Sequence, residues 1–165
     1  MTQDEHVEAR RSHLASIARC ATDALHANGL AQKNWIFEWD NAVRRFGHCR
    51  YMSRRITLSK PLCAINTFAK AKDTILHEIA HALVGRGIGH GPRWVTQAQA
   101  LGCTGDRCYD STVTEPPRKF VGTCPDCGMY MMRHRRKARL ACLSCCREHN
   151  NGQWDAQFML TWRRC

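Results

Sequence analysis

The pentad His77-Glu78-Ile79-Ala80-His81 constrains this chain more than any other stretch. On a helix, His77 and His81 lie four residues apart and project from one face, where two imidazoles can share a metal ion. Glu78 then stands beside the first ligand, within reach of a water on the metal, where a general base is needed. The neighbouring residues 75–84 are largely apolar, so we expect a metal to satisfy two partly buried imidazoles rather than two solvated histidines on a surface helix.

The segment after this helix contains one strong candidate for a third ligand. Glycines recur at alternate positions over residues 85–89 and let the backbone turn back sharply. No Glu follows within 20 residues and the first Asp is Asp106, so His90 is the strongest ligand available. A catalytic zinc takes three protein ligands and keeps a position open for water. We therefore expect His77, His81 and His90 to hold a catalytic zinc.

Helical and stranded patterns alternate along the first 117 residues. The period of the apolar residues and the capping residues predict where each element lies. The predicted elements are an amphipathic helix over 4–27, strands over 35–39 and 54–59, a helical turn over 40–46 closed by Gly47, a break over 61–66, the pentad helix from a cap at Asn66 or Thr67 to about Val84, and a helix over 93–101 with Pro92 suited to its first turn. This mixture predicts an α+β fold.

The pentad and the residues that follow it resemble the SprT-like, or Spartan-type, metalloprotease domain. In that family an H-E-x-x-H helix is followed, across a loop, by His-Gly-x-x-Trp or -Phe, matched here by 90–94, His90-Gly91-Pro92-Arg93-Trp94. A strand with Trp35, a turn at 47–49 and an Arg-Ile-x-Leu-Ser strand at 55–59 extend the match. The spacing from His81 to His90 is too long for a metzincin.

The resemblance implies a zincin-like metalloprotease core with a zinc ribbon after it. It also implies a zinc endopeptidase in which zinc-activated water attacks the substrate and Glu78 moves the proton. Proteins bound or crosslinked to DNA are the implied substrates, which points to DNA-protein crosslink repair. Two alternatives remain open on the residues alone: a non-catalytic zinc-containing DNA-binding protein, and a zinc hydrolase that acts on nucleic acid. Glu78 counts against the first, because a structural site needs no carboxylate there.

Two C-x2-C pairs near the C-terminus predict a second zinc. Cys124 and Cys127 are separated by fourteen residues from Cys142 and Cys145, and each pair can hold one side of a tetrahedral ion. Cys146 is the alternative to Cys145 as the fourth ligand. Four thiolates leave no open position, so we expect a structural zinc in a small β ribbon over 118–165, with strands over 129–136 and 156–162. The total is then two Zn2+ per chain, one catalytic and one structural.

The predicted ribbon is strongly basic. The whole chain carries a formal charge of +11, and residues 118–165 hold ten Lys or Arg against three acidic residues, or +7. A basic surface with aromatic side chains for base stacking favours DNA, single-stranded or bound without sequence preference. The expected stacking residues are Tyr130, Trp154 and Trp162. The expected nucleic-acid-binding residues are Arg133, Arg135, Arg136, Lys137 and Arg139.

The remaining features concern organisation and location. Glu115-Pro116-Pro117 is the expected linker between a core over 1–117 and the ribbon. No apolar run approaches the roughly 20 residues of a membrane helix, and the N-terminus lacks a signal pattern, so we expect a soluble, cytoplasmic monomer. Cys103 and Cys108 can form a weak metal clip or a redox pair, but two buried free thiols are the simpler interpretation.

Overall fold

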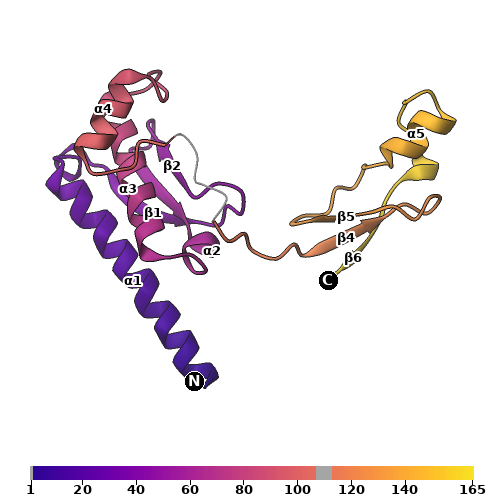
Figure 1. Cartoon of the computed structure of the whole chain (residues 1–165), viewed down its shortest axis with the longest axis horizontal. Coiled ribbons are helices and arrows are strands. Elements are labelled where there is room, and N and C mark those ends of the chain that lie inside the picture. The colour runs from indigo at the N-terminus through magenta and orange to yellow at the C-terminus, as the bar shows by residue number, and fades with distance from the viewer. Residues whose placement is uncertain (1, 107–112) are drawn as a thin grey trace. The chain divides into compact units, whose positions relative to one another are not determined.

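The structure is a computed structural model that describes residues 2–106 and 113–165. It divides into two compact units, Met1–Pro116 and Pro117–Cys165, which we call the N-terminal and the C-terminal unit (Figure 1). Together they form a mixed helical and stranded protein, so the prediction of an α+β fold is confirmed. Among the described residues, no helix is both long and apolar enough to cross a bilayer.

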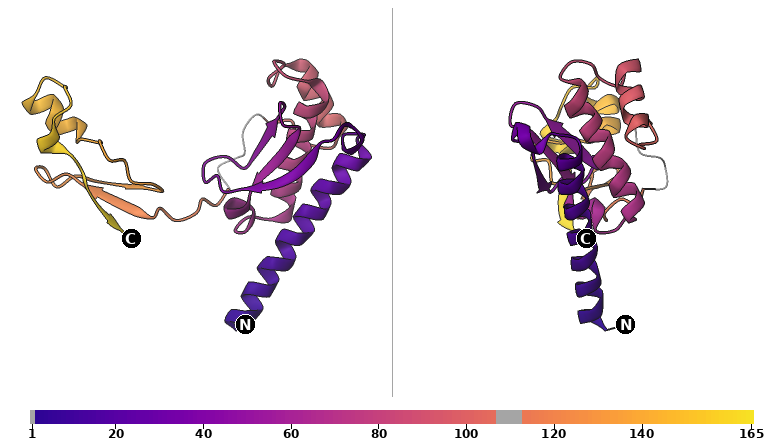
Figure 2. Two further views of the ribbon diagram at one scale, coloured as in Figure 1. Left: turned by 180° about the vertical axis from the view of Figure 1, so that it is seen from behind. Right: turned by 90° about the vertical axis from the view of Figure 1, so that its left-hand side faces the viewer.

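The N-terminal unit packs helices against one face of a small sheet. The strand order is β1-β3-β2, with β1 parallel and β2 antiparallel to the central strand β3. Helix α1 lies against β1, helix α3 lies against β2, β3 and α1, and α4 packs on α3 (Figures 1 and 2). The elements are α1 (Gln3–Ala27), a 3-10 turn (Ala31–Lys33), β1 (Ile36–Asp40), β2 (Gly47–Arg50), β3 (Arg55–Ser59), α2 (Lys60–Cys63), α3 (Phe68–Val84) and α4 (Pro92–Ala100).

Alternation along β3 explains which face the helices cover. Ile56 and Leu58 are fully buried and belong to the same core as Ile17 of α1 and Ile75 of α3. Residues directly opposite each other share a face, so Glu38 and His48 lie on the same side as Thr57, away from the helices. The sheet therefore has an apolar face that supports α3 and a polar face that holds the connecting loops.

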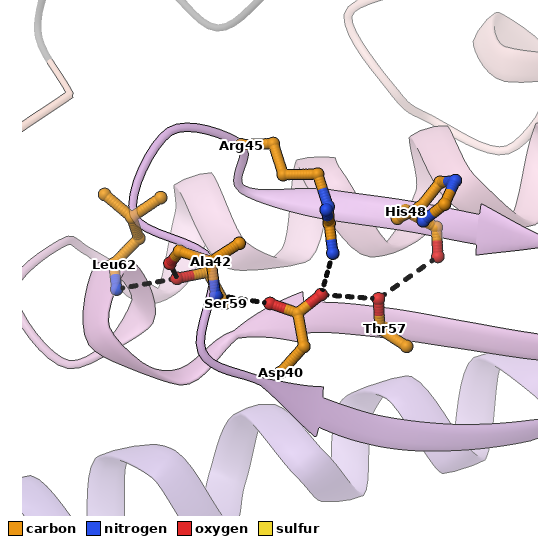
Figure 3. Close-up of polar contacts among 7 residues, drawn as sticks. All are labelled: Asp40, Ala42, Arg45, His48, Thr57, Ser59 and Leu62. Carbon is orange, nitrogen blue, oxygen red and sulfur yellow. Dashed lines mark hydrogen bonds and ion pairs between the residues drawn. The ribbon is translucent and has the colours of Figure 1, made fainter. Parts of the chain in front are cut away.

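The segment 41–46 is a loop with bends, so the prediction of a helical turn there was wrong. The carboxylate of Asp40 accepts hydrogen bonds from the Ala42 main-chain N–H at 2.9 Å and from Thr57 Oγ1 at 2.9 Å. It also accepts one from Arg45 Nη2 at 2.5 Å (Figure 3). An Asp side chain that accepts a hydrogen bond from the main-chain N–H two residues later competes with helix formation. The hydrogen bond from Thr57 of β3 holds Asp40 in this non-helical arrangement.

Two neighbouring predictions also need correction. The segment 47–49, expected to be a turn, is the start of β2, because it pairs with the otherwise free edge of β3. The expected break over 61–66 contains the short helix α2, whose first turn is capped by Ser59: its Oγ accepts from the Leu62 N–H at 3.1 Å and donates to the Ala42 carbonyl at 2.5 Å (Figure 3). The Ser59 hydroxyl thus binds both the loop 41–46 and the start of α2.

The long helices follow the predictions closely. Helix α1 begins with a capping box between Thr2 and Glu5 and ends after Ala27. Thr67 caps α3 by accepting a hydrogen bond from the Lys70 N–H at 3.4 Å, and α3 ends at Val84 as predicted. Pro92 opens α4, for which we expected the range 93–101.

The C-terminal unit is a three-stranded antiparallel sheet beside one short helix. Its strand order is β5-β4-β6, and its core combines the clustered cysteines with Phe158 and Leu160. Its elements are β4 (Phe120–Thr123), β5 (Tyr130–Arg133), α5 (Leu143–His149), a 3-10 turn (Ala156–Phe158) and β6 (Thr161–Arg164).

The two predicted strands of the C-terminal unit differ from the observed strands in their bounds. The strand expected over 129–136 is β5 alone, and the one expected over 156–162 begins with a 3-10 turn before β6. Asp155 explains the second difference, because its carboxylate accepts the Gln157 N–H at 2.9 Å and starts a turn. The central strand β4 and the helix α5 were not predicted.

Candidate metal centres

Helix α3 presents two histidines toward a cleft. Its apolar face, which includes Ile75 and Ile79, is buried in the core, while His77 and His81 are half-buried on the adjacent face. The four-residue spacing brings their rings to 5.0 Å between centroids. The helix thus places two of the three predicted ligands side by side on one face.

The chain returns the third histidine to this pair. Gly85 has φ of 91°, which ends α3, and the loop carries His90 back over the same face. His90 Nε2 lies 3.1 Å from His81 Nε2 and 3.1 Å from His77 Nε2. Three nitrogens at about 2.05 Å from a tetrahedral zinc would be about 3.3 Å apart, so the donor set fits this ion closely.

Trp94 closes the inner side of this cluster. The side chain is fully buried on α4, and its ring centroid lies 4.6, 5.1 and 4.5 Å from those of His77, His81 and His90. Its Nε1–H has no hydrogen-bond partner among the described residues. The three imidazoles therefore rest on a rigid aromatic surface that limits their rotation.

Glu78 lies beside the histidines but packs toward the sheet. It is only 7% exposed, and its carboxylate accepts a hydrogen bond from the main-chain N–H of Cys49 in β2. Gly47 leaves the space for it, because a Cβ there would lie 2.9 Å from both Glu78 Cγ and Oε1. Burial raises the pKa of Glu78 to about 7, against the opposing effects of the Cys49 N–H and of Arg45. The carboxyl can therefore exchange a proton near neutral pH.

His77 and His81 favour the neutral form. Burial lowers the pKa of His77 to about 4, with a further contribution from His90. Burial also lowers the pKa of His81 to about 4, helped by its two histidine neighbours. Metal binding requires a free lone pair on each ring, so this environment prepares the cluster for a cation.

The cluster opens into a cleft of about 650 Å³. Its lining includes Arg44 and Arg45 from the loop before β2 and Tyr51, which follows β2. Asp73 and Asp106, which the sequence predictions did not include, also line it. Asp73 lies one helical turn before His77, and this spacing could have identified it as a neighbour of the site. No sequence pattern indicated that the main chain near Asp106 would reach the site.

Four cysteines form a second cluster in the C-terminal unit. The Sγ atoms of Cys124 and Cys145 are 3.7 Å apart, as are those of Cys127 and Cys142. Sulfurs in a disulfide are about 2.05 Å apart, whereas four sulfurs at about 2.3 Å from a tetrahedral zinc are about 3.8 Å apart, so the set fits a metal and not disulfides. Cys146 is buried beside the cluster without belonging to it.

Cys103 is a buried free thiol, and burial raises its pKa. Its predicted partner Cys108 lies outside the described residues.

The predicted nucleic-acid contacts lie at the end of β5 and in the loop after it. Arg136 is placed over the ring of Phe120 at 5.4 Å and Arg139 over that of Trp154 at 4.9 Å. The other members of the set are Arg133, which is partly buried, and Arg135 and Lys137, which are exposed.

The three predicted stacking residues, Tyr130, Trp154 and Trp162, differ in how accessible their rings are to a base. The Trp162 ring packs on Gly122, where an added Cβ would lie 2.8 Å from the ring, and the Trp162 Nε1–H donates to the Lys137 carbonyl at 3.1 Å. Trp154 contacts an arginine, as described above. Tyr130 is 70% exposed on β5 and offers the most accessible ring.

A helix that pairs two histidines, receives a third from the next loop and buries a glutamate beside them has the arrangement of a metallohydrolase centre. The SprT-like family model matches residues 18–115, more than half of the chain, and the chain belongs to this family, which is associated with metallopeptidase activity. The match ends before the four cysteines. No curated protein and no solved structure matched the chain.

Proposed function

We propose that the chain is a zinc-dependent endopeptidase with a zincin-like core whose zinc is held by His77, His81 and His90. The observation that carries this proposal is the joint position of the three Nε2 atoms and the buried Glu78 carboxylate in the lining of one cleft. Family membership supports the same chemistry.

Zinc bound there would supply a Lewis acid that polarises the scissile carbonyl and makes a water more acidic. Glu78 accepts the proton of the attacking water and delivers it to the leaving amine. Burial raises the pKa of Glu78, which strengthens the carboxylate as a proton acceptor and suits it to the role of general base. The N–H of Cys49 holds the carboxylate in place in the lining of the cleft during this exchange.

The test incubates the zinc-loaded chain with an unfolded protein and with DNA, beside Glu78→Gln and His81→Ala. We expect wild-type cleavage, a loss of at least about 100-fold in Glu78→Gln with zinc retained, and loss of zinc from the histidine site in His81→Ala. Intact protein substrate with cut nucleic acid would favour the nucleic-acid hydrolase. Tight DNA binding with neither activity would favour the non-catalytic protein and refute the proposal.

We further propose that the substrates are DNA-bound or DNA-crosslinked proteins and that the C-terminal unit, with a structural zinc on its four cysteines, holds the DNA. The support is its charge of +7 over residues 118–165, the exposed cations that follow β5, and the exposed ring of Tyr130. Backbone phosphates attract such cations without sequence preference, and any base can stack on an aromatic ring.

A charge-matched comparison tests this second part. Arg135→Ala/Lys137→Ala should weaken binding to single-stranded DNA and reduce the salt dependence of log K by about 0.7 for each phosphate that the protein no longer neutralises. Arg10→Ala/Arg11→Ala removes two exposed arginines from α1 and serves as the control. Equal weakening in both variants would show a general charge effect and would contradict a site after β5.

A further inference from the structure

Asp73 holds the segment that follows α4. Its Oδ1 accepts the main-chain N–H of Thr104 at 2.8 Å, and its Oδ2 accepts the Thr104 hydroxyl at 3.2 Å. Two hydrogen bonds from one residue to one carboxylate make a specific clamp, because backbone and side chain must both be in place. The clamp joins α3 to the chain beyond α4, one helical turn before His77.

The clamped segment leads directly to the histidine cluster. Thr104 Oγ1 accepts the N–H of Asp106 at 3.4 Å, which continues the turn. The main-chain carbonyl of Asp106 then accepts a hydrogen bond from the ring of His77. His77 Nε2 faces His90 at 3.1 Å, so the nitrogen that donates to Asp106 is Nδ1.

This second hydrogen bond decides how His77 can bind a metal. A proton held on Nδ1 leaves the lone pair on Nε2, where the other two histidines converge. It also sets the orientation of the ring, and partners of this kind commonly change metal affinity 10–100-fold when they are removed. Helix α3 supplies the position of His77, but the Asp106 carbonyl supplies its tautomer and direction.

We propose that Asp73 is a positioning residue for the histidine metal site, acting through Thr104 and the Asp106 carbonyl on His77. The inference rests on the metal site of the proposed function. Two other roles for Asp73 would give different results: a general contribution to the stability of the N-terminal unit, or a direct effect of its negative charge on the nearby imidazole.

Two substitutions separate these roles. Asp73→Asn removes the charge but keeps an oxygen for the Thr104 N–H and an amide that can donate to the Thr104 hydroxyl, so the clamp remains. Asp73→Ala removes both charge and clamp. Asp23→Ala, on the exposed side of α1, is the control for loss of one carboxylate.

The measurement is zinc affinity at the histidine site of the full chain, by competition with a chelator, together with the visible absorption of the cobalt(II)-loaded site. Urea unfolding of the zinc-free chain follows stability separately. We expect Asp73→Ala to weaken zinc binding about 10–100-fold and to change the cobalt spectrum. Asp73→Asn and Asp23→Ala should stay within about threefold of wild type, well below that range.

Wild-type zinc affinity and cobalt spectrum in Asp73→Ala would overturn the inference, whatever happens to the urea transition. Equal weakening in Asp73→Ala and Asp73→Asn would also overturn it, because charge alone would then explain the effect. Failure of the metal site itself gives a different result. In that case His81→Ala and the wild-type chain would bind zinc equally well.

Discussion

Gly47 is the residue at which the smallest substitution should impair the proposed base. It lies in β2, and its φ is not positive, so alanine meets no backbone strain there. The added Cβ would lie 2.6 Å from Thr74 Cγ2 and 2.9 Å from both Glu78 Cγ and Oε1. Carbon atoms in ordinary contact are about 3.5–4.0 Å apart, so both side chains must move by about 0.6–1.4 Å.

The expected cost follows from that displacement. Glu78 is 7% exposed and bound to the Cys49 N–H, so it cannot move outward without breaking this hydrogen bond. Overpacking of this kind lowers the free energy of unfolding by about 1–3 kcal/mol. A base displaced by about 1 Å can lower kcat by about 100-fold. We expect Gly47→Ala to lower kcat by about 10–100-fold and to leave zinc affinity unchanged.

The assay compares kcat, zinc affinity and urea unfolding in Gly47→Ala, in Gly47→Ala/Thr74→Ser and in wild type. Serine removes the Cγ2 atom and with it the shortest contact, so the double variant should recover part of the stability. It should not recover activity, because the contact with Glu78 remains. A folded Gly47→Ala with wild-type kcat, or full recovery of kcat in the double variant, would refute the argument that Gly47 is required by Glu78.

Three further predictions concern other parts of the molecule. Trp94→Phe should retain zinc and lower the free energy of unfolding by at most about 2 kcal/mol, because it also removes a buried Nε1–H without a described partner. Trp94→Ala should lower the free energy of unfolding by about 3–5 kcal/mol. Urea unfolding measures both values. Cys127→Ser should remove one of two zincs and unfold only the C-terminal unit, as followed by zinc content and limited proteolysis. Asp40 is partly buried, which raises its pKa, but the Ala42 N–H, Arg45 and Thr57 outweigh burial and hold that pKa below its usual value. The stabilisation removed by Asp40→Asn should therefore be greatest at neutral pH and disappear as the pH falls below about 4, as measured by urea unfolding of both proteins across that range.

Local patterns were enough to predict the helix that carries the pentad. Its cap at Thr67, its end at Val84 and the common face of His77 and His81 depend on the helical repeat and on residues within a few positions. The return of His90 could be predicted because the glycine loop left few other ligands. The family, predicted from the same residues, is confirmed over 18–115.

Elements decided by distant partners were predicted less well. Residues 41–46 have an acceptable helical pattern, but Asp40 is held by Thr57 of a strand that comes later in the chain. Strand β4 is only four residues long and includes Gly122, so its central place in the sheet depends on the flanking strands rather than on its own pattern. In both cases tertiary pairing outweighs local preference.

The candidate site also contains groups that could be predicted from the sequence and groups that could not, and the difference has a chemical reason. Metal ligands and bases must be particular side chains at particular spacings, which a sequence displays directly. The groups that orient them are largely main-chain atoms, namely the Cys49 N–H on Glu78 and the Asp106 carbonyl on His77, and every residue except proline has both groups. What the sequence does record is the condition that lets the main chain approach: no Cβ at Gly47, and a carboxylate at Asp73 to fix the turn. Substitutions at those two positions therefore test the orientation of the site while leaving its chemical groups in place.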